Sequence, residues 1–64
     1  MPSSVIQDWR YDPAERRLRI RFQTGRRYAY LAVPPEIARG LAAASSKGEF
    51  FNEAIRDHFA FERE

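Results

Sequence analysis

The chain has 64 residues, of which 44% are hydrophobic and 14% aromatic, with a formal net charge of +2 and no cysteine. A chain of this length forms one domain, residues 1–64, whose small core must come from aromatic and aliphatic side chains. The lack of cysteine excludes disulfides and thiolate metal sites, and no apolar run is long enough to cross a bilayer. Because the sequence also shows no export signal, we expect a cytoplasmic protein without a membrane partner.

The charges are divided unevenly along the chain. Residues 1–34 contain seven arginines and three carboxylates, a net charge of +4, whereas residues 35–64 contain four cations and six carboxylates, a net charge of −2. A basic first half beside an acidic second half favours a polyanionic partner for the first half.

The first predicted strand runs from Val5 to Tyr11. Trp9 and Tyr11 lie on one face and Ile6 and Asp8 on the other, so alternation alone does not decide which face is buried. The Asp-Pro sequence that follows is typical of a turn, because aspartate bonds nearby backbone and proline fixes φ.

Residues 17–22 alternate arginine with apolar residues, which predicts a strand with one buried face. Leu18, Ile20 and Phe22 form the core face. The three arginines of the opposite face are interpreted either as a solvated surface that discourages edge pairing or as an anion-binding surface.

The turn after this strand sets the register of a hairpin. Thr24 is β-branched and poor at the positive φ of a two-residue turn, whereas a three-residue loop, residues 23–25, requires positive φ only at Gly25. This loop places Ile20 opposite Tyr28 and Leu18 opposite Tyr30, with both tyrosines on the core side. The alternative register places them outside beside the arginines, as a surface suited to stacking bases.

Two helices are expected after the third strand, which ends at Val33. Proline in the first turn starts the first helix at residues 34–36, and Gly40 marks a close approach to the sheet or to the next helix. A capping box, Ser46 to Glu49, starts the second helix, which is expected to continue to about His58 or Phe59. Residues 61–64 are expected to fray. The predicted fold is α+β: a three-stranded antiparallel β-meander followed by two α-helices packed on one face of the sheet.

Several short motifs follow one another along almost the whole chain. They are Tyr11-Asp12, Leu18-x-Ile20-x-Phe22, Gly25-x-x-Tyr28-x-Tyr30, Val33-Pro34, Ala44-x-Ser46-x-Gly48, Phe50-Phe51-Asn52 and Ile55-Arg56. With these motifs the chain resembles the KTSC domain, the C-terminal domain of some lysyl-tRNA synthetases, which also occurs as small standalone bacterial proteins. The resemblance implies RNA binding, proposed from the attachment to a tRNA-charging enzyme, and it implies no catalytic residues.

Catalytic chemistry is not expected. The only histidine is His58, and a nucleophile needs a nearby base. No spaced set of ligands suggests a metal, so we expect no enzyme, no metal, no cofactor and no small-molecule substrate. A polar cluster at the start of the second helix is interpreted first as helix capping and second as an anion site. It is formed by Ser46, Gly48 and Asn52, with Lys47 and Arg56 as further cations for the anion.

The sequence therefore predicts a small non-catalytic module that binds RNA, with tRNA as one candidate, through the arginine-rich sheet face. The candidate RNA-binding residues are Arg10, Arg17, Arg19, Arg21, Arg27, Tyr28 and Tyr30. The alternative is a protein-interaction module, or one that forms a homodimer, through the aromatic surface around Trp9 or through an open strand edge.

Overall fold

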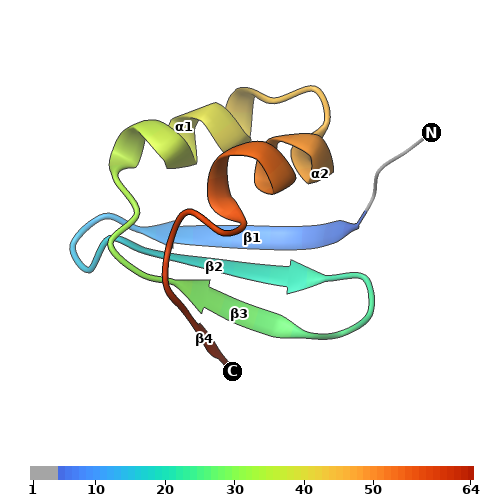
Figure 1. Ribbon diagram of the computed structural model, residues 1–64, viewed down its shortest axis with the longest axis horizontal. Helices are drawn as coiled ribbons and strands as arrows, with labels where there is room; N and C mark the ends of the chain where they lie inside the picture. The colour runs from blue at the N-terminus through green and yellow to red at the C-terminus, as the bar shows by residue number, and fades with distance from the viewer. Residues whose placement is uncertain (1–4) are drawn as a thin grey trace.

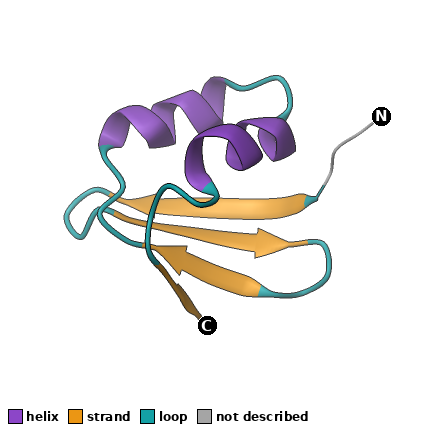
Figure 2. Ribbon diagram, viewed as in Figure 1, coloured by secondary structure: helices purple, strands orange, loops and turns teal. Residues whose placement is uncertain are grey.

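The computed structural model describes residues 5–64 and contains one antiparallel sheet with helices on one of its faces (Figures 1 and 2). The strands lie in the order β1-β2-β3-β4. The predicted α+β class and the packing of both helices on one face are confirmed, but the sheet has four strands rather than three. The elements are β1 (Ile6–Asp12), β2 (Arg17–Phe22), β3 (Arg27–Tyr30), α1 (Pro35–Ala43), α2 (Lys47–Phe50), the π-helical η1 (Phe51–Ile55) and β4 (Phe61–Arg63).

The hairpin between β2 and β3 has the predicted register. Ile20 lies opposite Tyr28 and Leu18 opposite Tyr30. The Phe22 amide donates to the Arg26 carbonyl at 2.9 Å, which closes the three-residue loop. Gly25 has φ +94°, a conformation that glycine adopts without the steric cost of a Cβ.

A bulge in β1 explains why alternation did not identify its buried face. The register shifts between Ile6, which lies opposite Phe22, and Asp8, which lies opposite Arg21. Gln7 is the extra residue, and an extra residue moves every earlier side chain to the other face. Ile6 consequently packs against the core on the same side as Trp9.

The second helical segment starts as predicted but ends early. The Glu49 amide donates to Ser46 Oγ at 3.3 Å, as one half of a capping box requires. The helix ends at Ile55 instead of reaching His58 or Phe59. Asp57 then has φ +67°, and the chain turns back toward the sheet.

The core lies between the sheet and the helices. Leu18, Ile20, Val33, Leu41 and Ile55 are its largest fully buried side chains. The predicted burial of Leu18, Ile20, Leu41, Phe51 and Ile55 is confirmed, whereas Phe22 is only half-buried because it lies at the end of its strand.

The fourth strand replaces the frayed tail that the sequence predicts. Phe61 lies opposite Tyr30 and Arg63 opposite Tyr28. The Glu64 amide donates to the Arg27 carbonyl at 2.9 Å. The tail thus supplies partners for backbone groups at the edge of β3 that would otherwise lack them. The third strand itself ends at Tyr30 rather than at Val33.

No helix within residues 5–64 is both long enough and apolar enough to cross a membrane.

Candidate functional site

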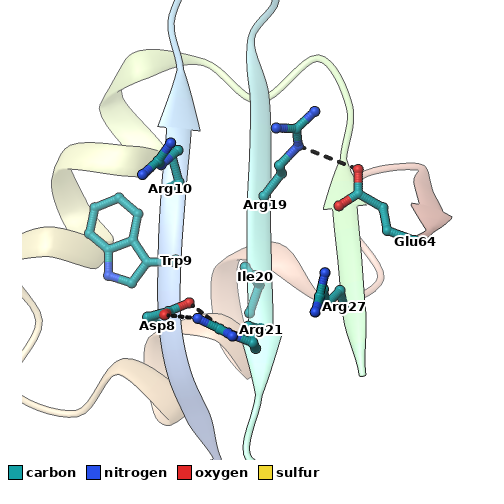
Figure 3. A pocket seen from close by; sticks show the side chains of 8 residues that line it. All are labelled: Asp8, Trp9, Arg10, Arg19, Ile20, Arg21, Arg27 and Glu64. Atoms are coloured by element: carbon teal, nitrogen blue, oxygen red, sulfur yellow. Dashed lines mark hydrogen bonds and ion pairs between the residues drawn. The ribbon is translucent and has the colours of Figure 1, made fainter. Parts of the chain in front are cut away.

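The outer face of the sheet, opposite the helices, carries the arginines that the sequence singled out (Figure 3). Arg19 in the centre of β2 lies between Arg10 of β1 and Ala29 of β3. Arg21, the next residue on this face, lies between Asp8 and Arg27. The predicted juxtaposition of Arg21 with Arg27 is confirmed. We call this surface, formed by Arg10, Arg17, Arg19, Arg21 and Arg27, the arginine face.

Arg21 forms a two-pronged ion pair with Asp8. Its Nη2 atom donates to Asp8 Oδ2 at 2.6 Å and its Nε atom donates to Oδ1 at 3.3 Å. The hydrogen bonds from Arg21 hold the pKa of Asp8 below its usual value near 3.8, and the charges of Arg10 and Arg27 act in the same direction. The bond to Asp8 correspondingly raises the pKa of Arg21. Asp8 therefore carries its negative charge at neutral pH.

Two further ion pairs come from β4 and the residue that follows it, neither of which the sequence analysis predicted. Arg17 Nη1 lies 3.3 Å from Glu62 Oε1, and Arg19 Nε lies 3.4 Å from Glu64 Oε2. The carboxylates of Glu62 and Glu64 thus lie beside guanidinium groups of β2. Exposed pairs of this kind contribute about 0–1 kcal/mol to stability each. Little free energy is therefore lost when another anion replaces the carboxylate.

Arg10 and Arg27 differ from the other arginines of this face in their ion pairing. Both side chains are exposed, and neither has an ion pair with another residue of the described chain. They lie on β1 and β3, on either side of Arg19 and Arg21 (Figure 3). Counting the three carboxylates paired with it, the arginine face keeps a net charge of +2.

The arginine face also contains a shallow hollow of about 440 Å³. Four guanidinium-bearing residues line it, two of them the unpaired ones. The lining residues are Asp8, Trp9, Arg10, Arg19, Ile20, Arg21, Arg27 and Glu64. The arrangement can accept an anion with several oxygens, because arginine donates two parallel hydrogen bonds to phosphate or carboxylate.

Tyr28 and Tyr30 do not lie on the arginine face. Tyr30 is buried on the core side of β3 and Tyr28 is half-buried there. Burial, together with the neighbouring Tyr28, raises the pKa of the Tyr30 hydroxyl. Any contact of these tyrosines with RNA must therefore take place on the helix side of the sheet.

On that side the two tyrosines line a groove between β3–β4 and the helical segment α2–η1. The groove has a volume of about 740 Å³. Its aromatic residues are in mutual contact: the ring centroids of Tyr28 and Phe61 are 5.3 Å apart, and those of Tyr30 and Phe51 are 5.5 Å apart. The residues that line the groove are Val5, Phe22, Thr24, Arg26, Tyr28, Tyr30, Gly48, Glu49, Phe51, Asn52, Arg56, Asp57 and Phe61.

Sequence reasoning missed this groove because Phe61 was assigned to a frayed tail. The only signal was the polar cluster around Asn52 and Arg56, whose side chains are in contact: Arg56 Nη1 donates to Asn52 Oδ1 at 3.2 Å. The structure thus brings part of that cluster to the tyrosines.

The remaining candidates offer no catalytic constellation. His58 is exposed, and residues 5–64 contain no group of three histidine, cysteine or acidic side chains placed to hold a metal ion. Trp9 is half-buried and packs against the core, so its ring is mainly a structural contact.

Comparisons with known proteins agree with this fold. Residues 2–59 match the KTSC domain. A protein of Tsukamurella paurometabola is 46% identical over 57 residues, which cover 89% of this chain and 85% of that protein. A lysine–tRNA ligase of Nostoc punctiforme is 40% identical over 60 residues, which are 94% of this chain but only 11% of the ligase. The crystal structure of a KTSC domain protein from Yersinia pestis superposes with a TM-score of 0.93 and 36% sequence identity, covering 100% of this chain and 90% of that one.

Proposed function

This chain belongs to the KTSC domain family, and on that premise we propose that it is a non-catalytic module that binds single-stranded RNA on its arginine face. One observation carries the proposal: two unpaired, exposed arginines, Arg10 and Arg27, flank two others whose ion pairs are exposed. The chain is similar to a segment of a lysine–tRNA ligase, an enzyme whose name includes an RNA, and this similarity supports RNA as the polyanionic ligand.

The spacing of the arginine face suits an extended nucleic acid strand. Residues on one face of a strand recur roughly every 6.6–6.8 Å, twice the rise per residue. This repeat is comparable to the separation of neighbouring phosphates in an extended single strand. Successive phosphates can therefore meet Arg19 and Arg21 while the unpaired arginines hold them from either side.

Binding of this kind is expected to be weak, sensitive to salt and nearly independent of base sequence, because it is made to phosphates rather than to base edges. Phosphate oxygens would replace the carboxylates on Arg19 and Arg21. Each exchange trades one exposed ion pair for another, so the free energy of binding comes mainly from Arg10 and Arg27.

The test is a salt titration of binding to a short, labelled single-stranded RNA, followed by fluorescence anisotropy. Each phosphate contact contributes about 0.7 to the slope of log K against log salt for single strands. The double variant Arg10→Gln/Arg27→Gln should reduce that slope by about 1.4 and should weaken binding to every RNA sequence by a similar factor. Arg19→Gln/Arg21→Gln should also weaken binding, whereas Arg39→Gln on α1 should leave it nearly unchanged.

A parent protein that binds no RNA at low salt would refute the proposal. So would a double variant Arg10→Gln/Arg27→Gln with the affinity and salt slope of the parent.

A second candidate function, association with a protein or with a second copy of the chain, is supported by the two open edges of the sheet at β1 and β4. Salt dependence separates the two candidates, because apolar association does not release counterions as polyanion binding does. Association that persists at high salt, with no RNA binding, would favour the second candidate.

A further inference from the structure

The groove between β3–β4 and α2–η1 combines exposed aromatic surface with hydrogen-bonding groups. We propose that it binds an unpaired nucleobase of the same RNA strand whose phosphates lie on the arginine face. The inference rests on the proposed function for the contacts to the backbone, and it adds a site for a base on the opposite side of the sheet.

Phe61 supplies the stacking surface. The residue is 55% exposed, although its ring contacts Tyr28 edge-to-face and Tyr30 at a tilt, with centroid distances of 5.3 and 5.5 Å. Tyr28 and Tyr30 thereby support the Phe61 ring from the core side while leaving much of it accessible. A planar base that stacks on such a ring gains affinity whatever its sequence, because every base has a π-face.

The polar groups of the groove suit the edge of a base. Among the described residues, the hydroxyls of Tyr28 and Tyr30 have no hydrogen-bond partner. The Oδ1 atom of Asn52 accepts a bond from Arg56, so its NH₂ group remains free to donate. The groove therefore offers donors from these groups and from the guanidinium groups of Arg56 and Arg26, and acceptors from the carboxylates of Glu49 and Asp57. The edge of a nucleobase carries both donors and acceptors, so it can pair with both kinds of group.

An apolar protein side chain would fit this groove less well. Such a side chain would remove the two free hydroxyls, the Asn52 amide and the Arg56 guanidinium from water without replacing their hydrogen bonds, which is costly. A base replaces those bonds with its own polar edge and still covers the rings. The combination of an exposed ring with solvent-exposed polar groups thus favours a nucleobase.

The two sites are separated only by the edge of the sheet. Phe61 of β4 faces the groove, whereas Glu62 of the same strand and Glu64, directly after it, face the arginines. A three-residue strand is therefore all that lies between the arginine face and the stacking ring. An RNA strand that follows the arginine face can pass over β4 and place a base in the groove.

The test compares two ligands of equal charge: an abasic ribose-phosphate oligomer and the same oligomer with one adenine at its centre. The parent should bind the adenine oligomer about fivefold to 150-fold more tightly, the range found for one stacked base. Phe61→Leu should abolish that gain without weakening binding to the abasic oligomer. Phe61→Tyr, which keeps the ring, should retain the gain, and Asn52→Ala should reduce it. Arg10→Gln/Arg27→Gln should weaken binding to both oligomers by the same factor.

The outcomes of this test distinguish a failure of the groove inference from a failure of the proposed arginine-face function. Equal binding of both oligomers by the parent, or a gain that survives Phe61→Leu, would overturn the groove inference and leave the arginine face as proposed. Equal binding of both oligomers with self-association that Phe61→Leu abolishes would assign the groove to a second copy instead. Adenine-dependent binding without binding of the abasic oligomer would support the groove and refute the arginine face.

Discussion

Neutralising Glu62 of β4 and Glu64, the residue that follows this strand, should strengthen RNA binding. In the protein these carboxylates are paired with Arg17 at 3.3 Å and with Arg19 at 3.4 Å. A phosphate that binds these arginines must displace them. The double variant Glu62→Gln/Glu64→Gln removes both competitors and two negative charges, while the glutamine side chains keep the size of the originals and suit an exposed strand.

The size of the effect follows from the strength of the displaced pairs. Exposed ion pairs contribute typically about 0.2–1 kcal/mol each, so removing two of them should increase RNA affinity roughly twofold to thirtyfold at low salt, since 1.4 kcal/mol is a factor of ten. The free energy of unfolding should fall by the same modest amount, at most about 2 kcal/mol.

The assay is anisotropy of labelled single-stranded RNA at low salt, with urea unfolding of the same samples. The matched control is Glu36→Gln/Glu53→Gln, which changes the net charge equally on the helical side. Affinity that stays at the parent value or falls in Glu62→Gln/Glu64→Gln would refute the reasoning. An equal gain in the control would show that net charge, rather than the arginine face, governs binding.

Three further predictions concern stability. Ile55→Ala, at a fully buried position, should cost about 2–5 kcal/mol in urea unfolding, and a parent-like midpoint would place the core elsewhere. Gly40→Ala should not stabilise the protein despite a helix propensity gain of roughly 1 kcal/mol, because the new Cβ would lie 2.6 Å from Phe50 Cζ. In a Phe50→Leu variant the same change should stabilise the fold. Identical effects of Gly40→Ala in both proteins would contradict this steric contact. The lowered pKa of Asp8 means that its stabilising effect is present above about 3.8 and is lost as the pH falls through the lower folded value. The stability difference between the parent and Asp8→Asn should therefore shrink on acidification, and a difference independent of pH would exclude the ion pair with Arg21 as its cause.

The hairpin could be predicted from the sequence because its signals are local. Thr24 disfavours one loop length and Gly25 favours another, and the loop length alone fixes which residues of β2 and β3 are paired. The register then placed Tyr28 and Tyr30 on the core side. The face of β1 could not be predicted in the same way, because the bulge at Gln7 depends on pairing with β2 and leaves no trace in the alternation.

The fourth strand was missed for a similar reason. The segment Phe61–Arg63 has three residues, two of them charged, and shows too little alternation to indicate a strand. Its stability comes from backbone groups of β3 that are distant in the sequence. Without that strand, nothing in the sequence indicated that Glu62 and Glu64 reach the arginines. The sequence also provided no reason to place Phe61 beside the tyrosines, so the groove could not be predicted.

Because carboxylates already occupy part of the arginine face, the affinity of this face for an anion should depend on the length of the anion. An inorganic phosphate or a mononucleotide can replace one carboxylate at a time, and each such replacement gains almost nothing, because one exposed ion pair is exchanged for another. Only a ligand with two or more linked phosphates can place one beside Arg10 and Arg19 and the next beside Arg21 and Arg27, and so engage both unpaired guanidinium groups at once. For RNA bound in this way, affinity should rise steeply once an oligomer has enough phosphates to reach both pairs of arginines and then level off, so that short anions abundant in a cell leave the face free.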